Sequence, residues 1–272
     1  MVQLLQSSSL RESRVKCTPE EDLLWSKLYE TQVNRLKGYV YKDFHTHLQN
    51  LQLPQHSVPQ LSDVSAALRA HTGWVVSKVD GLINYDEFFY LLSRRIFPST
   101  TKLRKTSNFS KDPDIFHEIF GHVPMLLNPR YADFLQQVGL LALQSPLYLL
   151  PAIQRILWYT IEVGLIRENG DLKLYGASLI SSTKESEYAL HSSKAIRSRW
   201  NLVSVIRSPY RADILQRRYY ILESFEELYG LVEALGNLKE LYREAKSLGE
   251  FDPGFTVQPT KYRNANIFHE GA

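Results

Sequence analysis

Residues 113–124 read PDIFHEIFGHVP and contain the pattern around which the rest of the chain is organised. The pattern places His117 and His122 five residues apart. In a continuous α-helix this spacing points two side chains about 140° apart, so a regular helix would separate the imidazoles. We therefore expect Gly121 to end the helix in a left-handed conformation, with Pro124 preventing its continuation, so that both imidazoles converge. The converging pair predicts a metal site, and two hydrogen-bonded structural histidines are the alternative.

The composition is that of an ordinary globular protein and argues against several other classes. Of 272 residues, 44% are apolar and 22% are charged, which suits a chain long enough to bury a sizeable core. The net charge of +3, from 32 basic and 29 acidic side chains, is too small and too evenly spread to indicate a nucleic-acid or membrane partner. The lone Cys17 excludes an internal disulfide framework, and no segment has the apolar length of a signal peptide or membrane span. We therefore expect a cytoplasmic protein whose partners are small molecules.

Helical periodicity dominates the chain, and the expected fold is one mainly α (α+β) domain with a few short strands. We expect a mobile arm at residues 1–17, the domain itself at residues 18–250, and an irregular tail at residues 251–272. Thr18-Pro19-Glu20-Glu21 combines an N-cap, a proline at the first helical position and an acid at N3, which predicts the start of the first helix. Further helices are expected at residues 41–51, 59–72, 86 onward, 131–143, 152–165, part of 177–199 and, longest of all, from Ser224 onward. Strands are expected at residues 74–79, 172–175, 202–206 and 219–222, with a turn at residues 169–171.

A buried carboxylate is the missing part of the metal-site hypothesis, because two neutral imidazoles alone bind a divalent ion weakly. Glu162 lies within the apolar segment 157–166, where an unpaired carboxylate is costly and coordination of a cation removes the penalty. Two histidines and one carboxylate leave coordination positions open, an arrangement suited to ferrous iron and dioxygen. The alternative pairs Glu162 with Arg155 or Arg167. A zinc-protease arrangement with Glu118 as the base is disfavoured, because the histidines are five rather than four residues apart.

The motif at residues 113–124 matches the signature of the pterin-dependent aromatic amino acid hydroxylases at every constrained position. Family-like segments follow in the expected order between about residues 20 and 230, namely PQLSDVS (59–65), TG (72–73), GLI (81–83), WYTIE (158–162), YGA (175–177), SS (181–182) and SPYR (208–211). The chain therefore resembles this family over the whole catalytic domain. Its short length is similar to the bacterial phenylalanine hydroxylases, which lack the regulatory domain and tetramerisation helix of the animal forms.

The resemblance implies a non-haem iron(II) monooxygenase that uses a tetrahydropterin and O2 to hydroxylate the ring of a free aromatic amino acid. Conversion of phenylalanine to tyrosine is the leading expectation, and a monomer or small homo-oligomer is expected. A tryptophan-specific or meta-specific hydroxylase of the same family stays open, as does a non-catalytic relic that binds metal or pterin. The implied iron ligands are His117, His122 and Glu162. The implied substrate residues are Arg104 for the carboxylate, Trp158 for the ring, and Ser181 and Glu185 behind the iron; the implied pterin residues are Gly81, Leu82, Ile83, Phe88 and Glu118.

The sequence also departs from the family pattern at several places around the expected pocket. The segment 104–117 is two residues shorter than usual, and Thr183-Lys184 replaces a common Phe-Gly pair. Leu157 stands where an aromatic residue is common, and residues 215–217 read LQR rather than FQP. None of these positions is an implied metal ligand. The departures therefore bear on the choice of substrate rather than on the reaction class.

Overall fold

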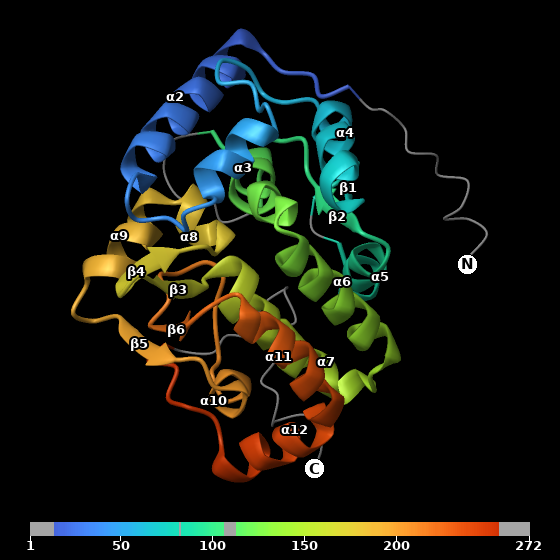
Figure 1. Ribbon diagram of the computed structural model, residues 1–272, viewed down its shortest axis with the longest axis vertical. Helices are drawn as coiled ribbons and strands as arrows, with labels where there is room; N and C mark the ends of the chain where they lie inside the picture. The colour runs from blue at the N-terminus through green and yellow to red at the C-terminus, as the bar shows by residue number, and fades with distance from the viewer. Residues whose placement is uncertain (1–13, 82, 106–112, 256–272) are drawn as a thin grey trace.

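Helices form most of the structure, a computed structural model that describes residues 14–81, 83–105 and 113–255 (Figure 1). The predicted mainly helical architecture with a few short strands is confirmed. The N-terminal part contains α2 (Pro19–Leu36), α3 (Phe44–Asn50), α4 (Leu61–Thr72), β1 (Val75–Lys78), α5 (Tyr85–Ser93) and β2 (Ile96–Ser99). β1 and β2 pair in parallel, with Val75 opposite Ile96. β2 was not predicted, because a four-residue strand that includes Pro98 gives only a weak sequence pattern.

The first helix begins as predicted. The hydroxyl of Thr18 accepts a hydrogen bond from the backbone N–H of Glu21, and the Glu21 carboxylate accepts one from the backbone N–H of Thr18. This reciprocal pair satisfies two N–H groups that the first helical turn leaves without partners. Val15, within the expected mobile arm, is buried and exchanges two hydrogen bonds with the side chain of Gln60. The described end of the arm, residues 14–17, is therefore anchored rather than free.

A four-stranded sheet with the order β4-β3-β6-β5 flanks the other side of the molecule (Figure 1). Its strands are β3 (Leu165–Glu168), β4 (Asp171–Leu174), β5 (Ile196–Arg199) and β6 (Arg218–Leu222). The predicted turn joins β3 to β4, and both Asn169 (φ 52°) and Gly170 (φ 87°) take the left-handed conformation that a tight hairpin requires. The predicted helix at 152–165 extends too far, because β3 already begins at Leu165. The predicted strand at 202–206 is wrong: these residues form α10 (Leu202–Ile206), whose start is capped by the side chain of Asn201.

Between β2 and β3 the chain forms η1 (Phe116–His122), η2 (Val123–Leu127), α6 (Pro129–Gln144), η3 (Leu147–Leu149), α7 (Leu150–Leu157) and η4 (Trp158–Glu162). After the β-hairpin it forms α8 (Ala177–Ser181) and α9 (Thr183–His191), and α9 lies at the left edge of the molecule beside the four-stranded sheet (Figure 1). Most residues of η1 and η4, the two segments that contain the expected metal ligands, are buried. Aromatic rings fill the interior around them, and the buried rings of Phe116 and Phe120 are stacked with centroids 4.7 Å apart.

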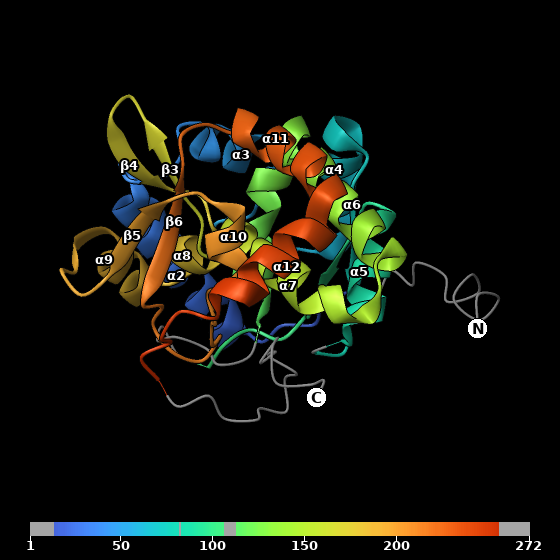
Figure 2. The ribbon, with the colours of Figure 1, turned by 90° about the horizontal axis from the view of Figure 1, so that it is seen from below.

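The C-terminal helices cover α6 and α7 from one side (Figure 2). The long helix predicted from Ser224 is divided into α11 (Glu226–Ala234), the short 3₁₀ turn η5 (Leu235–Asn237) and α12 (Leu238–Leu248). As expected, residues 251–255 form neither helix nor strand, yet Phe251 is held between the guanidinium groups of Arg207 and Arg218. No helix in the described part of the chain is long and apolar enough to cross a membrane.

Candidate active site

The two histidines are brought together by a π-helix rather than by a helix end. Residues Phe116–His122 form η1, whose chain continues directly into the 3₁₀ helix η2 with Pro124 in its first turn. Gly121 has no positive φ, so the predicted left-handed break at this residue is wrong. Hydrogen bonds in a π-helix join residues five apart, and this wider turn places positions i and i+5 on the same side. Two histidines five positions apart, which an α-helix would point in different directions, therefore lie on the same side of a π-helix.

Gly121 serves close packing instead of chain reversal. A Cβ atom at this position would lie 3.0 Å from the carbonyl oxygen and 3.2 Å from the Cβ of Ala177, at the start of α8. Glycine therefore lets η1 approach α8 more closely than any other residue would. The same approach places the hydroxyl of Ser181 3.0 Å from Nδ1 of His117.

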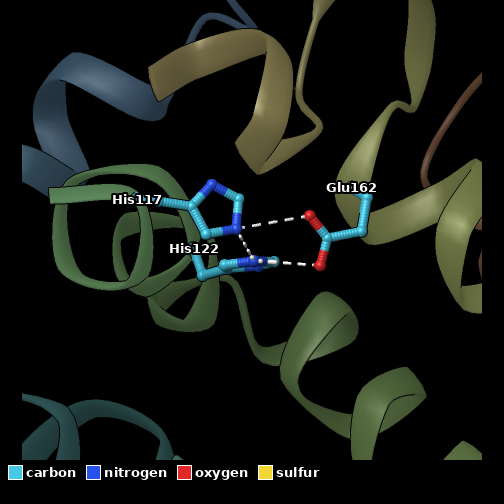
Figure 3. A group of neighbouring side chains, drawn as sticks. All are labelled: His117, His122 and Glu162. Atoms are coloured by element: carbon cyan, nitrogen blue, oxygen red, sulfur yellow. Dashed lines mark hydrogen bonds and ion pairs between the residues drawn. The ribbon is translucent and has the colours of Figure 1, made fainter. Parts of the chain in front are cut away.

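His117, His122 and Glu162 converge on one point (Figure 3). The Nε2 atoms of the two histidines are 3.1 Å apart. The Glu162 carboxylate places one oxygen 3.4 Å from Nε2 of His117 and the other 3.2 Å from Nε2 of His122. Two atoms that each lie about 2.1 Å from one ion at right angles are about 3 Å apart. The 3.1 Å between the two imidazole nitrogens therefore fits neighbouring ligands of one ion, and the Glu162 carboxylate faces one imidazole with each of its oxygens. Within the described residues, this is the one group of His, Cys, Asp and Glu side chains with such convergence.

Glu162 reaches this position from the end of η4, a second π-helix. The hydroxyl of Ser178 donates a hydrogen bond of 3.0 Å to Oε2 of Glu162 and so orients its carboxylate. The alternative in which Glu162 pairs with an arginine is wrong. Arg155 binds Glu250 at 2.6 Å, and Arg167 lies 3.5 Å from Glu223.

The electrostatics of the cluster favour a positive charge between its members. Burial disfavours protonated His117, but the hydrogen bond and charge of Glu162 outweigh this effect and raise the pKa of His117. Burial lowers the pKa of His122. Burial also opposes ionisation of Glu162, yet the two histidines hold the pKa of its carboxyl well below the usual range. The cluster thus keeps an anion beside two imidazoles, the donor set that a divalent cation would neutralise.

A cavity of about 490 Å³ opens beside this cluster and is large enough for a small organic ligand. Of the expected pterin residues, Gly81, Ile83, Phe88 and Glu118 line the cavity, and Leu82 lies outside the described residues. Of the expected substrate residues, Arg104, Trp158 and Ser181 line it. Burial raises the pKa of the Glu118 carboxyl to about 8. Residues from distant parts of the sequence are therefore brought to one cavity, as the resemblance implied.

Arg104 is buried and already has an acidic partner. Its Nε and Nη2 atoms donate to the two carboxylate oxygens of Asp114 at 2.9 and 2.7 Å, and Nη1 donates to the carbonyl of Ser181 at 3.1 Å. A guanidinium has five N–H groups, so two remain for another acceptor. Asp114 was not predicted as a functional residue, although it lies in the motif at residues 113–124.

Glu185 does not line the cavity but lies behind its wall. The buried Glu185 carboxylate accepts hydrogen bonds from the hydroxyl of Tyr219 at 2.5 Å and from the backbone N–H of Gln216 at 2.9 Å. Gln216 in turn accepts a hydrogen bond of 3.1 Å from the indole N–H of Trp158. Tyr210 also lines the cavity and stacks on Trp158. Sequence reasoning missed the roles of Gln216 and Tyr210, although Tyr210 lies in the family-like SPYR segment.

Comparison with known proteins agrees with this geometry. The family described as biopterin-dependent aromatic amino acid hydroxylase matches residues 8–256. The chain belongs to this family. The hydroxylase is 37% identical to the phenylalanine-4-hydroxylase of Chromobacterium violaceum. The alignment spans 213 residues and covers 77% of this chain and 72% of the relative.

Solved structures place the hydroxylase in the same fold. The phenylalanine hydroxylase of Legionella pneumophila superposes with a TM-score of 0.84 at 37% identity, covering 89% of this chain and 96% of that one. The Chromobacterium violaceum enzyme with bound iron(III) and oxidised cofactor 7,8-dihydrobiopterin superposes with a TM-score of 0.82 at 33% identity, covering 89% and 88% of the two chains. The predicted family and the single hydroxylase domain are confirmed.

Proposed function

We propose that this hydroxylase converts phenylalanine to tyrosine with iron(II), a tetrahydropterin and O2. The observation that carries the proposal is the opening of the His117–His122–Glu162 cluster onto a cavity of about 490 Å³. Residues expected for the amino acid and for the pterin both line this cavity. The relatives from Chromobacterium violaceum and Pseudomonas aeruginosa, which are similar over 77% and 86% of the chain, are phenylalanine-4-hydroxylases.

His117, His122 and Glu162 are the proposed iron ligands. Nδ1 of His117 lies 3.0 Å from the hydroxyl of Ser181, and in the tautomer whose Nδ1–H donates to this hydroxyl the lone pair of Nε2 is free to bind the ion. Ser178 orients the Glu162 carboxylate in the same way. When bound, iron, tetrahydropterin and O2 together supply the oxidant that hydroxylates an aromatic ring.

The other residues of the cavity position the two organic molecules. Arg104, oriented by Asp114, offers its two remaining N–H groups to the carboxylate of the amino acid. Trp158, Phe88 and Glu118 line the cavity. Trp158 would form the wall against the substrate ring, Phe88 would stack on the pterin, and Glu118 would be the acid on the pterin side. The apolar side chains of the cavity exclude water from the ring that reacts.

The bounds of the catalytic domain, the oligomeric state and the cellular compartment are also part of the proposal. The catalytic domain spans residues 18–250, and the protein acts as a monomer or small homo-oligomer. We place the reaction in the cytoplasm, because the half-buried free thiol of Cys17 and the ferrous state both suit a reducing compartment. Neither nucleic acid nor membrane is a proposed partner.

The test is anaerobic loading with ferrous iron followed by exposure to O2 with tetrahydropterin and one amino acid at a time. Phenylalanine, tryptophan and tyrosine are compared, and products are separated by chromatography. We expect para-tyrosine from phenylalanine and much slower hydroxylation of the other two. Pterin oxidation with no tyrosine from phenylalanine would contradict the substrate, and no pterin oxidation with any amino acid would contradict the reaction.

A further inference from the structure

Two aromatic rings form a double layer on one side of the cavity. Trp158, the first residue of η4, and Tyr210, which follows α10, both line the cavity. Their ring centroids are 4.4 Å apart, and the ring planes are inclined by only 11°. Stacked rings share a large contact area, so a shift of one ring requires a shift of the other.

Gln216 holds this pair from behind. Its side chain is buried and its Oε1 atom accepts from the indole N–H of Trp158 at 3.1 Å. Its Nε2 atom donates to the carbonyls of Arg211 at 2.6 Å and Ile214 at 2.9 Å, in the segment that follows Tyr210. A primary amide offers two donor hydrogens and an acceptor oxygen, and both hydrogens and the oxygen form hydrogen bonds here. One side chain therefore fixes the indole and the backbone beside its stacking partner.

The position of Gln216 is itself anchored to the four-stranded sheet. Its backbone N–H donates to the Glu185 carboxylate, which also accepts from the hydroxyl of Tyr219 in β6. Glu185 and Tyr219 are both buried, so these bonds are protected from water. Tyr85, at the start of α5, also lines the cavity and forms a side-chain hydrogen bond with Tyr210. The ring pair is thus restrained by Gln216 and by Tyr85.

We propose that Gln216 is a positioning residue that holds Trp158 and Tyr210 as one rigid wall of the cavity, and that this wall sets which aromatic amino acid is accepted. The inference rests on the proposed hydroxylation of an amino acid in this cavity. Gln216 does not line the cavity, so it acts through the two rings. Its loss widens the range of positions that the rings can take and weakens discrimination between substrates of different ring size.

Gln216→Met tests the inference, because methionine has a similar length but cannot form the three side-chain hydrogen bonds. The KM for phenylalanine should rise by about five- to tenfold, because part of the binding free energy is then spent on ordering the two rings that Gln216 holds in the wild type. Less tyrosine should form per pterin oxidised, and the ratio of kcat/KM for phenylalanine to that for tryptophan should fall. The KM for tetrahydropterin should stay within about twofold of wild type, because the expected pterin residues lie on other segments.

Gln136→Met is the matched control. Gln136 on α6 also loses two hydrogen bonds, to Arg95 and to the carbonyl of Ser93, and it does not line the cavity. Its substitution should lower the unfolding temperature without changing KM, coupling or substrate ratio. If Gln216→Met lowers stability in the same way and leaves those three quantities unchanged, Gln216 is only structural and the inference is wrong.

Trp158→Phe provides a second route that does not depend on Gln216→Met folding. The phenyl side chain at position 158 still stacks on Tyr210 but has no N–H donor for Gln216. The ratio of kcat/KM for phenylalanine to that for tryptophan should therefore fall, as in Gln216→Met, and an unchanged ratio would contradict the inference. Calorimetric titration of the anaerobic iron(II) protein with phenylalanine and with tryptophan measures selectivity without turnover. If the ratio of the Kd for phenylalanine to the Kd for tryptophan is the same in wild type and in Gln216→Met, the inference is wrong. Absence of tyrosine formation by wild type would instead count against the proposed function alone.

Discussion

The Nε2 atoms of His117 and His122 lie 3.1 Å apart although the two histidines are five positions apart in the sequence. The relationship depends on the π-helical turn of η1. The same device recurs at η4, where the N–H of Val163 bonds to the carbonyl of Trp158, five residues earlier, directly beside Glu162. π-Helical turns are less stable than α-helical ones and are found mostly at functional sites. Here they aim all three proposed ligands at one point.

Glu162→Ala should remove the only anionic member of the cluster. We expect iron affinity to fall by more than about 100-fold and coupled tyrosine formation to be lost, because two neutral imidazoles remain. The fold should persist, since the Glu162 side chain is 21% exposed and its removal leaves no unpaired buried charge. Iron stoichiometry after gel filtration and thermal unfolding measure the two effects. Glu240→Ala, at an exposed acid of α12, is the control, and equal iron content in both variants would refute the proposed ligand set.

Arg104→Lys should replace a planar fork with a single point charge. The KM for phenylalanine should rise by at least about tenfold, because lysine cannot bind Asp114 with two parallel bonds and also reach a second carboxylate. Stability should fall by about 1–2 kcal/mol, since one buried hydrogen bond to Asp114 is lost. Steady-state kinetics and urea unfolding check the prediction. Arg243→Lys, in an exposed pair with Glu240, should change neither quantity, and an unchanged KM in Arg104→Lys would mean that another group binds the carboxylate.

Gly121→Ala should force η1 away from α8. The new methyl group would lie 3.0 Å from the carbonyl oxygen of Ala177, so we expect a loss of about 1–3 kcal/mol and weaker iron binding. Gly230→Ala in α11 has no heavy atom within 4 Å of the added Cβ and should be neutral or stabilising by about 0.5–1 kcal/mol. Chemical unfolding and iron titration compare the two variants. Equal stability would show that the close approach of η1 to α8 is not needed.

Glu185→Gln should change how stability depends on pH. Burial raises the pKa of the Glu185 carboxyl above 4.5, so the folded state binds its proton more tightly than the unfolded state. Stability from this group is therefore present at low pH and is lost as pH rises from about 4.5 through the folded-state pKa. Glutamine does not ionise, so Glu185→Gln does not lose stability in this way. Its free energy of unfolding relative to wild type should increase as pH rises from about 4.5 through the folded-state pKa of Glu185. Urea unfolding at a series of pH values measures the slope; Glu187→Gln, an exposed acid on the same helix, is the control, and parallel curves for Glu185→Gln and wild type would contradict the expectation.

Local features of the fold were predictable where a few neighbouring residues decide the conformation. The capping box at Thr18, the end of α4 at Thr72 and the turn at 169–171 all agree with the sequence predictions. Gly73, which follows α4, takes a φ of 75°. Predictions failed where two conformations suit the same residues. The segment 202–206 has the β-branched residues of a strand, but the Asn201 cap and packing against α7 and α12 make it helical. The helix expected from Ser224 is interrupted at residues 235–237, a break that its leucine spacing does not reveal.

The sequence by itself determined the family and the residues that we propose for the chemistry. The motif at 113–124 and the isolated Glu162 predicted the donor set, and the ordered family segments predicted the hydroxylase fold, which the structure confirms. Only the tertiary structure decided how these groups meet. The π-helical turns, the fork between Arg104 and Asp114, and the support of Trp158 by Gln216 all depend on contacts between distant segments. The physical reason is that a π-helical turn by itself is less stable than an α-helical one, so it persists only where tertiary packing stabilises it. The packing of Gly121 against Ala177 is such a contact, and no short stretch of sequence records it.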